Sequence, residues 1–251
     1  MGSHNGRVAV VTGGGRGIGQ EYALALAADG AAVVVADLDD DLAAESVKLV
    51  ERAGGTAVAR HVDVGDQDST AEFGAWLRRD LGGAHILVNN AAIYHSMRLD
   101  SQLEVDIGYW RRIFSVNLDG ALLMTQAVAP LMIEAGWGRI VNQASTAAYS
   151  GGGGAYAVSK LALIGLSQGF ARELGKHGIT VNVIAPGLIH TEATMVTVSE
   201  ATQAALVAQQ ALKKEGQPQD LVAALRFFCS DAAGWVSGQV TIVDGFKTVR
   251  I

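Results

Sequence analysis

Short apolar runs alternate with longer stretches of helical periodicity along the whole chain. The runs are apolar at consecutive positions, which is typical of parallel strands covered on both faces. Alternating strands and helices predict a parallel sheet with right-handed crossovers. The predicted strands are Val8–Val11, Ala32–Ala36, Ala57–Val62, Ile86–Val88, Arg139–Asn142, Thr180–Ala185 and Val240–Val243.

The segments between these runs carry apolar residues at helical spacing. They are Gln20–Asp29, Leu42–Ala53, Ser69–Leu81, Trp110–Glu134, Tyr156–His177 and Pro218–Ser230. Five glycines follow helical segments, where a left-handed C-cap is common: Gly30, Gly54, Gly82, Gly136 and Gly178. We therefore expect residues 1–251 to form one doubly wound, Rossmann-like α/β domain of about seven strands. The stretch Thr191–Gly216 is long for a connection and is expected to cover the substrate.

Composition narrows the class of protein. Gly supplies 31 of the 251 residues and Pro only 3, without a Gly-X-Y period, which excludes a collagen-like chain. The net charge of −6 argues against a nucleic-acid or anionic-membrane partner. A lone Cys229 cannot form an internal disulfide, and no apolar run reaches about 18 residues. These features predict a soluble protein of the cytoplasm, with no membrane partner.

A glycine-rich segment joins the first predicted strand to the first helix: Thr12-Gly13-Gly14-Gly15-Arg16-Gly17-Ile18-Gly19. Backbone N–H groups at such a helix start can bind a pyrophosphate, because no Cβ blocks its approach. Tight strand-to-helix turns also use glycine, so the loop alone does not decide the function.

Asp37 ends the second predicted strand, close to the offset at which an acid binds the adenosine ribose. A carboxylate there accepts from both ribose hydroxyls and repels a 2′-phosphate, which favours NAD(H). Alternatively, Asp37 only begins the acidic helix start that extends to Asp41. Arg16 could bind a 2′-phosphate, which would favour NADP(H).

Tyr156 and Lys160 lie four positions apart in a helical pattern, so both project from one helix face. A phenol with a reference pKa near 10 is too weak an acid for proton transfer at neutral pH. A nearby ammonium stabilises the phenolate and lowers that pKa. The pair therefore predicts an acid–base site, although two residues at this spacing also occur on plain helix surfaces.

Over nearly its whole length the chain resembles the short-chain dehydrogenases/reductases. The resemblance rests on the glycine loop, Asp37, the Asn89-Asn90-Ala91-Ala92 segment, the Tyr156/Lys160 pair and Pro186-Gly187, which follow one another in the family's order. It implies a catalytic set of Asn117, Ser145, Tyr156 and Lys160. It also implies cofactor contacts from Gly13, Arg16, Gly17, Ile18, Gly19, Asp37, Leu38, Asp63, Val64, Asn90, Ala91, Ala92, Tyr156, Lys160, Pro186, Gly187, Ile189 and Thr191.

The chain departs from the family pattern near the catalytic serine. Ala92 stands where the family has Gly, and Ala144 stands where it commonly has the first of two serines. Ser145 also lies closer to Tyr156 than is usual, and Thr146 is the alternative hydroxyl. The glycine cluster Gly151–Gly154 is expected to absorb the shorter spacing.

The resemblance implies hydride transfer between nicotinamide C4 and a carbinol or carbonyl carbon. Tyr156 would exchange the proton, and Lys160 would lower the Tyr156 pKa and bind the nicotinamide ribose. Ser145 would hold the substrate oxygen. Asn117 would anchor a water that relays protons to Lys160.

The same resemblance predicts a substrate pocket walled by Tyr94, His95, Ser145, Ala147, Tyr149, Leu188 and the 191–216 segment. This lining is mostly apolar and has no Arg pair for an anion, so we expect a hydrophobic secondary alcohol or ketone, NAD(H) and a homotetramer. The alternatives are a 3-oxoacyl (acyl-carrier-protein or CoA) reductase-like enzyme using NADP(H), or a catalytically silent NAD(H) sensor.

Two further enzyme classes are disfavoured. The segment Gly165-Leu166-Ser167-Gln168-Gly169 fits a hydrolase nucleophile motif, but it continues a helical pattern instead of following a strand. Its glycines are expected to be helix-packing positions. The six histidines lack the spacing with acids or Cys that is typical of a metal site.

Overall fold

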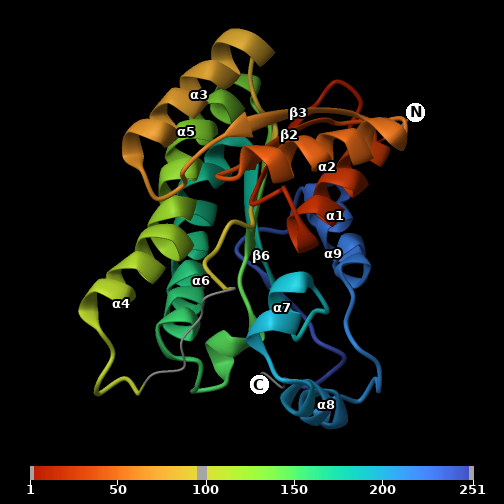
Figure 1. Ribbon diagram of the computed structural model, residues 1–251. Helices are drawn as coiled ribbons and strands as arrows, with labels where there is room; N and C mark the ends of the chain where they lie inside the picture. The colour runs from red at the N-terminus through yellow and green to blue at the C-terminus, as the bar shows by residue number, and fades with distance from the viewer. Residues whose placement is uncertain (1–2, 95–100, 249–251) are drawn as a thin grey trace.

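A computed structural model describes residues 3–94 and 101–248 of the protein. Seven strands form one sheet in the order β3-β2-β1-β4-β5-β6-β7, and all neighbours run parallel (Figure 1). This confirms the doubly wound sheet that the alternating pattern predicts. The strands are β1 (Val8–Thr12), β2 (Ala32–Asp37), β3 (Thr56–His61), β4 (Ile86–Asn89), β5 (Gly138–Gln143), β6 (Ile179–Pro186) and β7 (Val240–Val243).

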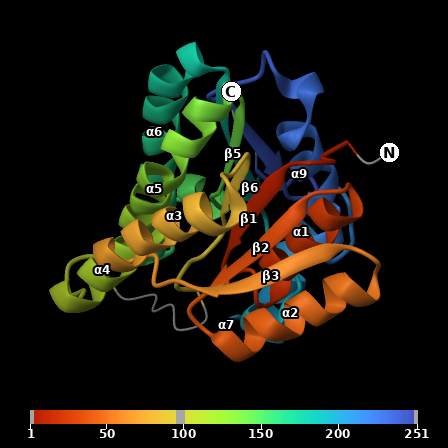
Figure 2. The same cartoon turned by 90° about the horizontal axis from the view of Figure 1, so that it is seen from above.

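Helices cover both faces of the sheet (Figure 2). One face carries α1 (Gly17–Ala28), α2 (Asp40–Arg52) and α9 (Val222–Cys229), and the other carries α3 (Gln67–Leu81), α5 (Gly120–Ala135) and α6 (Gly154–Leu174). Side chains alternate between the faces, so Val33 and Val35 of β2 enter one core cluster and Val34 the other. Two shorter helices, α7 (Glu192–Thr197) and α8 (Glu200–Gln209), lie together at one end of the molecule (Figure 1).

The local signals in the sequence are confirmed closely. Each strand lies within one residue of its expected bounds. The five predicted C-cap glycines all have positive φ, from +64° at Gly136 to +95° at Gly30. The stretch Thr191–Gly216 contains α7 and α8, as its helical composition indicates.

One expectation about these elements is wrong. Strand β3 is not buried on both faces, because it is an edge strand that pairs only with β2 and its residues alternate in exposure. The predicted helix Trp110–Glu134 is confirmed as the helical stretch Ile107–Ala135, but within it a π-helical turn (Ser115–Asp119) separates α4 (Ile107–Phe114) from α5. A π turn inserts one extra residue per hydrogen-bonded ring, which apolar spacing does not reveal.

The helical stretch Ile107–Ala135 is long and apolar enough to cross a bilayer by those two criteria alone. Its residues Met124, Val128 and Met132 are fully buried against the sheet. That packing is typical of a core helix.

Ser167 lies inside α6, fully buried, and donates a hydrogen bond of 2.6 Å to the Leu163 carbonyl. No strand-to-helix elbow exists at this point, which removes the basis for a hydrolase nucleophile. The neighbouring Gly165 and Gly169 are exposed, and a Cβ at either would meet no heavy atom within 4 Å. The expectation that they pack closely within the chain is therefore wrong.

We expect Cys229 to report unfolding of this core. Its side chain is fully buried, and burial raises the pKa of the thiol to about 12, so the reactive thiolate is scarce. Ellman's reagent should leave the native protein unlabelled for hours and label one thiol per chain in guanidinium. Rapid, stoichiometric labelling in native buffer would contradict this packing.

Candidate active site

The site lies where the chain order of the sheet reverses. Strands β1 and β4 are neighbours, but the chain continues from them to opposite sides of the sheet. At such a point the loops after the strand ends diverge and leave a crevice. A cavity of about 1660 Å³ lies there, lined by the loops after β1, β2, β4, β5 and β6, together with α7 and α8.

The glycine loop is fastened to the loop after β4. The Asn90 side-chain amide donates to the carbonyls of Thr12 and Gly13, each at 3.0 Å. In return, the Thr12 hydroxyl accepts from the N–H groups of Asn90 and Ala91 at 3.0 and 3.1 Å. Gly13 and Gly17 have φ of +61° and +56°, which L side chains rarely adopt.

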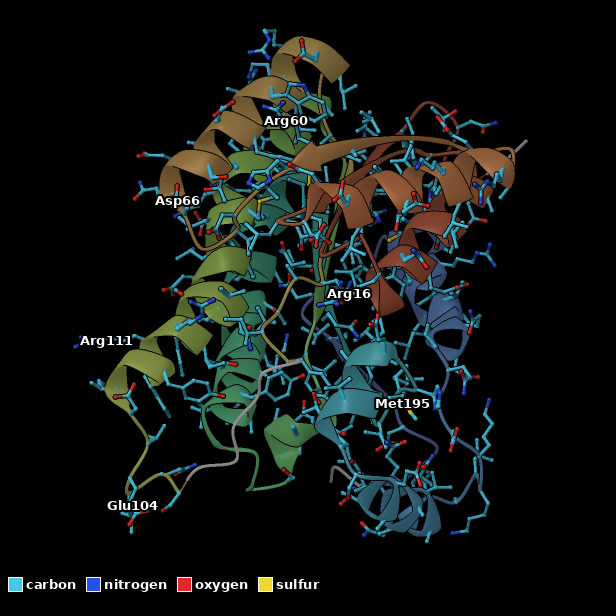
Figure 3. All side chains as sticks on the ribbon, viewed as in Figure 1. Arg16, Arg60, Asp66, Glu104, Arg111 and Met195 are labelled. Atoms are coloured by element: carbon cyan, nitrogen blue, oxygen red, sulfur yellow. The ribbon has the colours of Figure 1, made fainter. Side chains whose placement is uncertain are left out.

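Arg16 lies at the N-terminus of α1 and lines the cavity; Figure 3 shows it above α7, which carries Met195. Gly19 does not line the cavity. A Cβ on Gly19 would lie 2.0 Å from the Gly13 carbonyl oxygen, so this glycine permits close packing of α1 on the loop. Gly19 is therefore a packing residue of the loop and not the direct cofactor contact that we expected.

The carboxylate of Asp37 is held by the backbone at the end of β2. One oxygen accepts from Gly15 N–H at 2.8 Å, and the other accepts from Asp39 N–H at 3.1 Å. A Cβ on Gly15 would lie 2.9 Å from that first oxygen, so glycine is needed for the approach. Leu38, Asp63 and the other expected cofactor residues, apart from Gly19, also line the cavity: Val64, Asn90, Ala91, Ala92, Pro186, Gly187, Ile189 and Thr191.

Ser145 and Tyr156 meet at the floor of the cavity. Their hydroxyls are hydrogen-bonded, and the Ser145 hydroxyl also accepts from Ala147 N–H at 3.1 Å. Thr146 lines the cavity without taking this position, so the geometry favours Ser145.

The glycine cluster before α6 makes this pairing feasible. Gly151, Gly153 and Gly154 have φ of +68°, +89° and +56°, a run that only glycines adopt without strain. The tight turn compensates for the short spacing between Ser145 and Tyr156, as the sequence predicts.

Lys160 is buried one helical turn after Tyr156. Its ammonium donates to the Gln143 carbonyl at 2.7 Å and lies 5.8 Å from the centre of the Tyr156 ring. Burial lowers the pKa of Lys160 to about 8 and raises the pKa of Tyr156, against the effect of its bond to Ser145. The expected lowering of the Tyr156 pKa by Lys160 is not found in this arrangement, where desolvation raises that pKa.

A buried hydrogen bond that the sequence did not suggest adjoins Lys160. The Tyr22 hydroxyl of α1 donates to the Gln143 side-chain carbonyl at 2.9 Å, and both side chains are buried. Gln143 therefore joins Tyr22 through its side chain and Lys160 through its backbone. No family motif contains Tyr22, and a lone tyrosine in an apolar helix gives no signal of such a partner.

Asn117 lies in the π-helical turn and does not line the large cavity. Its side-chain oxygen accepts from Ile93 N–H at 2.7 Å, and its amide donates to the Ser159 hydroxyl at 3.3 Å. The side chain thus fixes the loop after β4. Its neighbours Ser115 and Val116 do line the cavity.

On the substrate side, Tyr94, Ala147 and Leu188 line the cavity as expected. The Tyr94 ring centre lies 5.4 Å from that of Tyr156, and burial raises the pKa of Tyr94. The Tyr94 hydroxyl is hydrogen-bonded to Thr194 of α7.

Of the expected wall residues that the structure describes, Tyr149 is not found there. It packs on the cluster formed by Ala144, Ile164, Val183 and Ala185. His95 lies outside the described residues. The 191–216 segment lines the cavity as expected, through Ala193, Thr194, Thr197, Val198, Thr202, Leu206 and Gln210. The sequence missed Lys247, a lining residue from the segment after β7. Within the described ranges, no three His, Cys, Asp or Glu residues gather as metal ligands.

Comparison with known proteins identifies the family. A family model described as enoyl-(acyl carrier protein) reductase matches residues 13–245. An uncharacterized oxidoreductase of Mycobacterium tuberculosis is 45% identical over 246 residues, which cover 97% of this chain and 98% of the relative. A solved short-chain type dehydrogenase/reductase from Mycobacterium ulcerans is 32% identical, with a TM-score of 0.90 over 97% of this chain and 90% of its own. The chain belongs to the short-chain dehydrogenase/reductase family.

Two further solved structures show the range of this family. A 7α-hydroxysteroid dehydrogenase complexed with NADH and 7-oxo glycochenodeoxycholic acid has a TM-score of 0.92 and 33% identity. A gluconate 5-dehydrogenase from Burkholderia cenocepacia in complex with NADP and tartrate has a TM-score of 0.92 and 32% identity. Each match covers 98% of this chain and 97% of the neighbour. This chain is therefore an NAD(P)-dependent oxidoreductase by family.

We expect Lys160→Met to change how stability depends on pH. The unfolded lysine titrates near pH 10.5 and the folded one near 8. Between these values the unfolded chain binds the extra proton, so the parent gains stability as pH rises. Met removes the buried charge, and its stability advantage should therefore shrink by about 2 kcal/mol between about pH 7.5 and 9.5.

Urea unfolding of both proteins across that range measures the change. Lys176→Met, at an exposed lysine outside the cavity, is the matched control and should give a flat difference. A flat difference for Lys160→Met would show that its ammonium is not desolvated.

Proposed function

We propose that this short-chain dehydrogenase/reductase transfers a hydride between NAD(H) and a secondary alcohol or ketone with an apolar body. The observation that carries the proposal is the Ser145–Tyr156 hydroxyl pair at the cavity floor, next to the buried Lys160 ammonium. This geometry supplies one proton-transfer group, one oxygen-binding group and one cation. A catalytically silent sensor has no need of this constellation.

The residues present fit a dinucleotide. The glycine loop offers backbone N–H groups at the start of α1 without Cβ atoms in the way, and Asp37 is fixed at the strand end beside it. When bound, the nicotinamide would accept or give the hydride. Pro186, Gly187, Ile189 and Thr191 line the opposite wall and would hold the nicotinamide end.

Electrostatics favour NAD(H) over NADP(H). The ribose end of the cavity is lined by Asp37, Asp39, Asp40 and Asp41, and a 2′-phosphate would meet this negative charge. Arg16 is the cation of the loop that would oppose it. One solved neighbour holds NADH and another holds NADP, so the comparison does not favour either cofactor. The preference for NAD(H) therefore depends on the four carboxylates.

In the oxidation direction, Tyr156 would take the proton from the substrate hydroxyl at its phenolic oxygen. Ser145 would hydrogen-bond the same substrate oxygen and stabilise its developing charge. Lys160 would favour the phenolate electrostatically and turn from Gln143 toward the nicotinamide ribose. The side-chain bonds of Asn117 to both backbone groups of Ile93 support a role in positioning the loop after β4.

The lining next to Tyr156 supports an apolar substrate body. The centre of the Tyr94 ring lies 5.4 Å from that of Tyr156, and the apolar side chains of Ala147, Leu188, Ala193 and Val198 line the same cavity. The bound 7-oxo compound of the hydroxysteroid dehydrogenase shows that this fold accepts a large ketone. We further propose a homotetramer in the cytoplasm, on the family pattern and the lone buried Cys229.

We expect Tyr156→Phe to lower kcat/KM by about 100-fold or more, the usual size of general acid–base catalysis. Reduction of cyclohexanone, acetophenone and a 7-oxo bile acid, followed at the nicotinamide absorbance, measures this. Phe keeps the ring contact with Tyr94, so NADH affinity should stay within about twofold, which serves as the folding control. Turnover within a few-fold of the parent would contradict the role of Tyr156.

We expect Asp37→Asn to lower the affinity for NADH relative to NADPH by about tenfold, since one charge-assisted hydrogen bond is lost. Asn keeps the acceptor for Gly15 N–H in the glycine loop and gives up the one for Asp39 N–H. Fluorescence titration with both cofactors measures the ratio. Asp68→Asn, at an exposed acid in α3, is the control. An unchanged NADH/NADPH ratio in Asp37→Asn would overturn the NAD assignment.

A further inference from the structure

The cavity that Tyr156 lines is also lined by the α8 region and by the segment after β7. Thr202, Leu206 and Gln210 belong to the α8 region, and Lys247 belongs to the segment after β7. Gly245 joins these elements, because its carbonyl accepts from the N–H groups of Ala211 and Leu212 at 2.9 and 3.0 Å. Lys247 is thus a lining cation far along the chain from every motif that the sequence singled out.

Lys247 lies in a different part of the fold from the other lysines and arginines that line the cavity. Arg16 belongs to the glycine loop, and Lys160 is the buried lysine beside Tyr156. Arg112 lies one turn before Ser115 on α4, on the side that faces the Asp63–Gly65 segment. Lys247 is therefore the lining cation, among the described residues, that lies in the segment after β7, which is bonded to the chain following α8.

The backbone around Lys247 is held in a fixed and costly shape. The two Asp244 oxygens accept from the N–H groups of Lys247 and Thr248 at 3.2 and 2.7 Å. Gly245 and Phe246 are consecutive left-handed residues, with φ of +63° and +61°. Among the described residues, Phe246 is the only non-glycine with positive φ. Strain of this kind is concentrated at functional sites, where the surrounding structure maintains it.

Within residues 3–94 and 101–248, the ammonium of Lys247 has no carboxylate partner. Asp244 is the nearest acid along the chain, and its oxygens are engaged by backbone N–H groups. A half-buried cation facing a cavity without a partner attracts an anionic ligand group.

We propose that Lys247 binds a carboxylate at the end of the substrate remote from the reacting carbon. The substrate is then an oxo acid or hydroxy acid with an apolar middle: the carbonyl at Ser145 and Tyr156, the apolar part against Tyr94 and Leu188, and the acid at Lys247. This inference rests on the proposed oxidoreductase function. It replaces the expectation of a pocket without a group for an anion, because the position of Lys247 in the fold could not be seen in the sequence.

A matched series of ketones tests the substrate class. The substrates are methyl ketones of four to ten carbons, each prepared in two forms: one with a terminal carboxylate and one with the corresponding carboxamide. The value of kcat/KM with NADH is measured for each compound. The parent should prefer the carboxylate by about tenfold at the chain length that spans the two ends, as expected for one charge-assisted contact. Lys247→Gln should bring this ratio to about one, and Lys247→Glu should bring it below one.

Lys176→Gln is the matched control, because Lys176 is exposed and does not line the cavity. It should keep the parental ratio. A carboxylate-to-amide ratio that stays the same in Lys247→Gln would overturn the proposal.

A binding measurement separates this inference from the proposed reaction. Octanoate and octanamide contain no ketone, so their affinity for the NADH-saturated enzyme, measured by calorimetry, does not depend on turnover. The parent should bind octanoate about tenfold more tightly than octanamide, and Lys247→Gln should lose the difference. Equal or undetectable binding of the two by the parent would overturn the anion site. Lys247-dependent octanoate binding without reduction of any ketone would instead overturn the proposed reaction and leave the anion site standing.

Discussion

The attachment of the β1 loop to the β4 loop is the constraint on which the rest of the site depends. A parallel sheet brings the ends of β1 and β4 together but gives their loops no shared backbone ladder. Asn90 and Thr12 supply that ladder through side chains, with four hydrogen bonds of 3.0–3.1 Å. The same bonds fix the glycine loop on one side of the crevice and the Ala91–Tyr94 segment on the other. The glycine loop and the Ala91–Tyr94 segment are therefore held in fixed positions relative to each other.

Burial sets the chemistry of the catalytic groups. Lys160 and Tyr156 lie at the protein interior, where desolvation opposes charge on either group and moves their pKa values in opposite directions. Gln143 links these groups to the fold, because its backbone carbonyl receives the Lys160 ammonium while its side chain receives the Tyr22 hydroxyl. Lys160 is thus hydrogen-bonded to the backbone of β5 and also lines the cavity. A surface pair at the same helical spacing would have nearly unperturbed pKa values and little catalytic use.

The sequence predicted the fold and the motif residues well, because local patterns determine both. Strand bounds follow from β-branched apolar runs, and C-cap glycines follow from their required positive φ. Asp37, Ser145, Tyr156 and Lys160 were identified because they belong to a spaced pattern. The π-helical turn around Asn117 escaped prediction, since its extra residue leaves the apolar spacing almost unchanged. Tyr149 was misplaced for a related reason: in a short 3₁₀ turn, the side-chain direction depends on the cluster it packs against.

The sequence by itself determined a doubly wound sheet and its glycine loop, and it singled out the Tyr156/Lys160 pair that we propose as catalytic. These features are local in the chain, so residue types at fixed spacings specify them. Only the tertiary structure decided which residues close the site from a distance. Tyr22 reaches Gln143 across 121 positions, and Lys247 enters the cavity through a strained turn after the last strand. The physical reason is that such contacts depend on where packed elements meet in space. The glycine surplus marks the sharp turns of this fold, but what the cavity presents to a substrate depends on the packing around it.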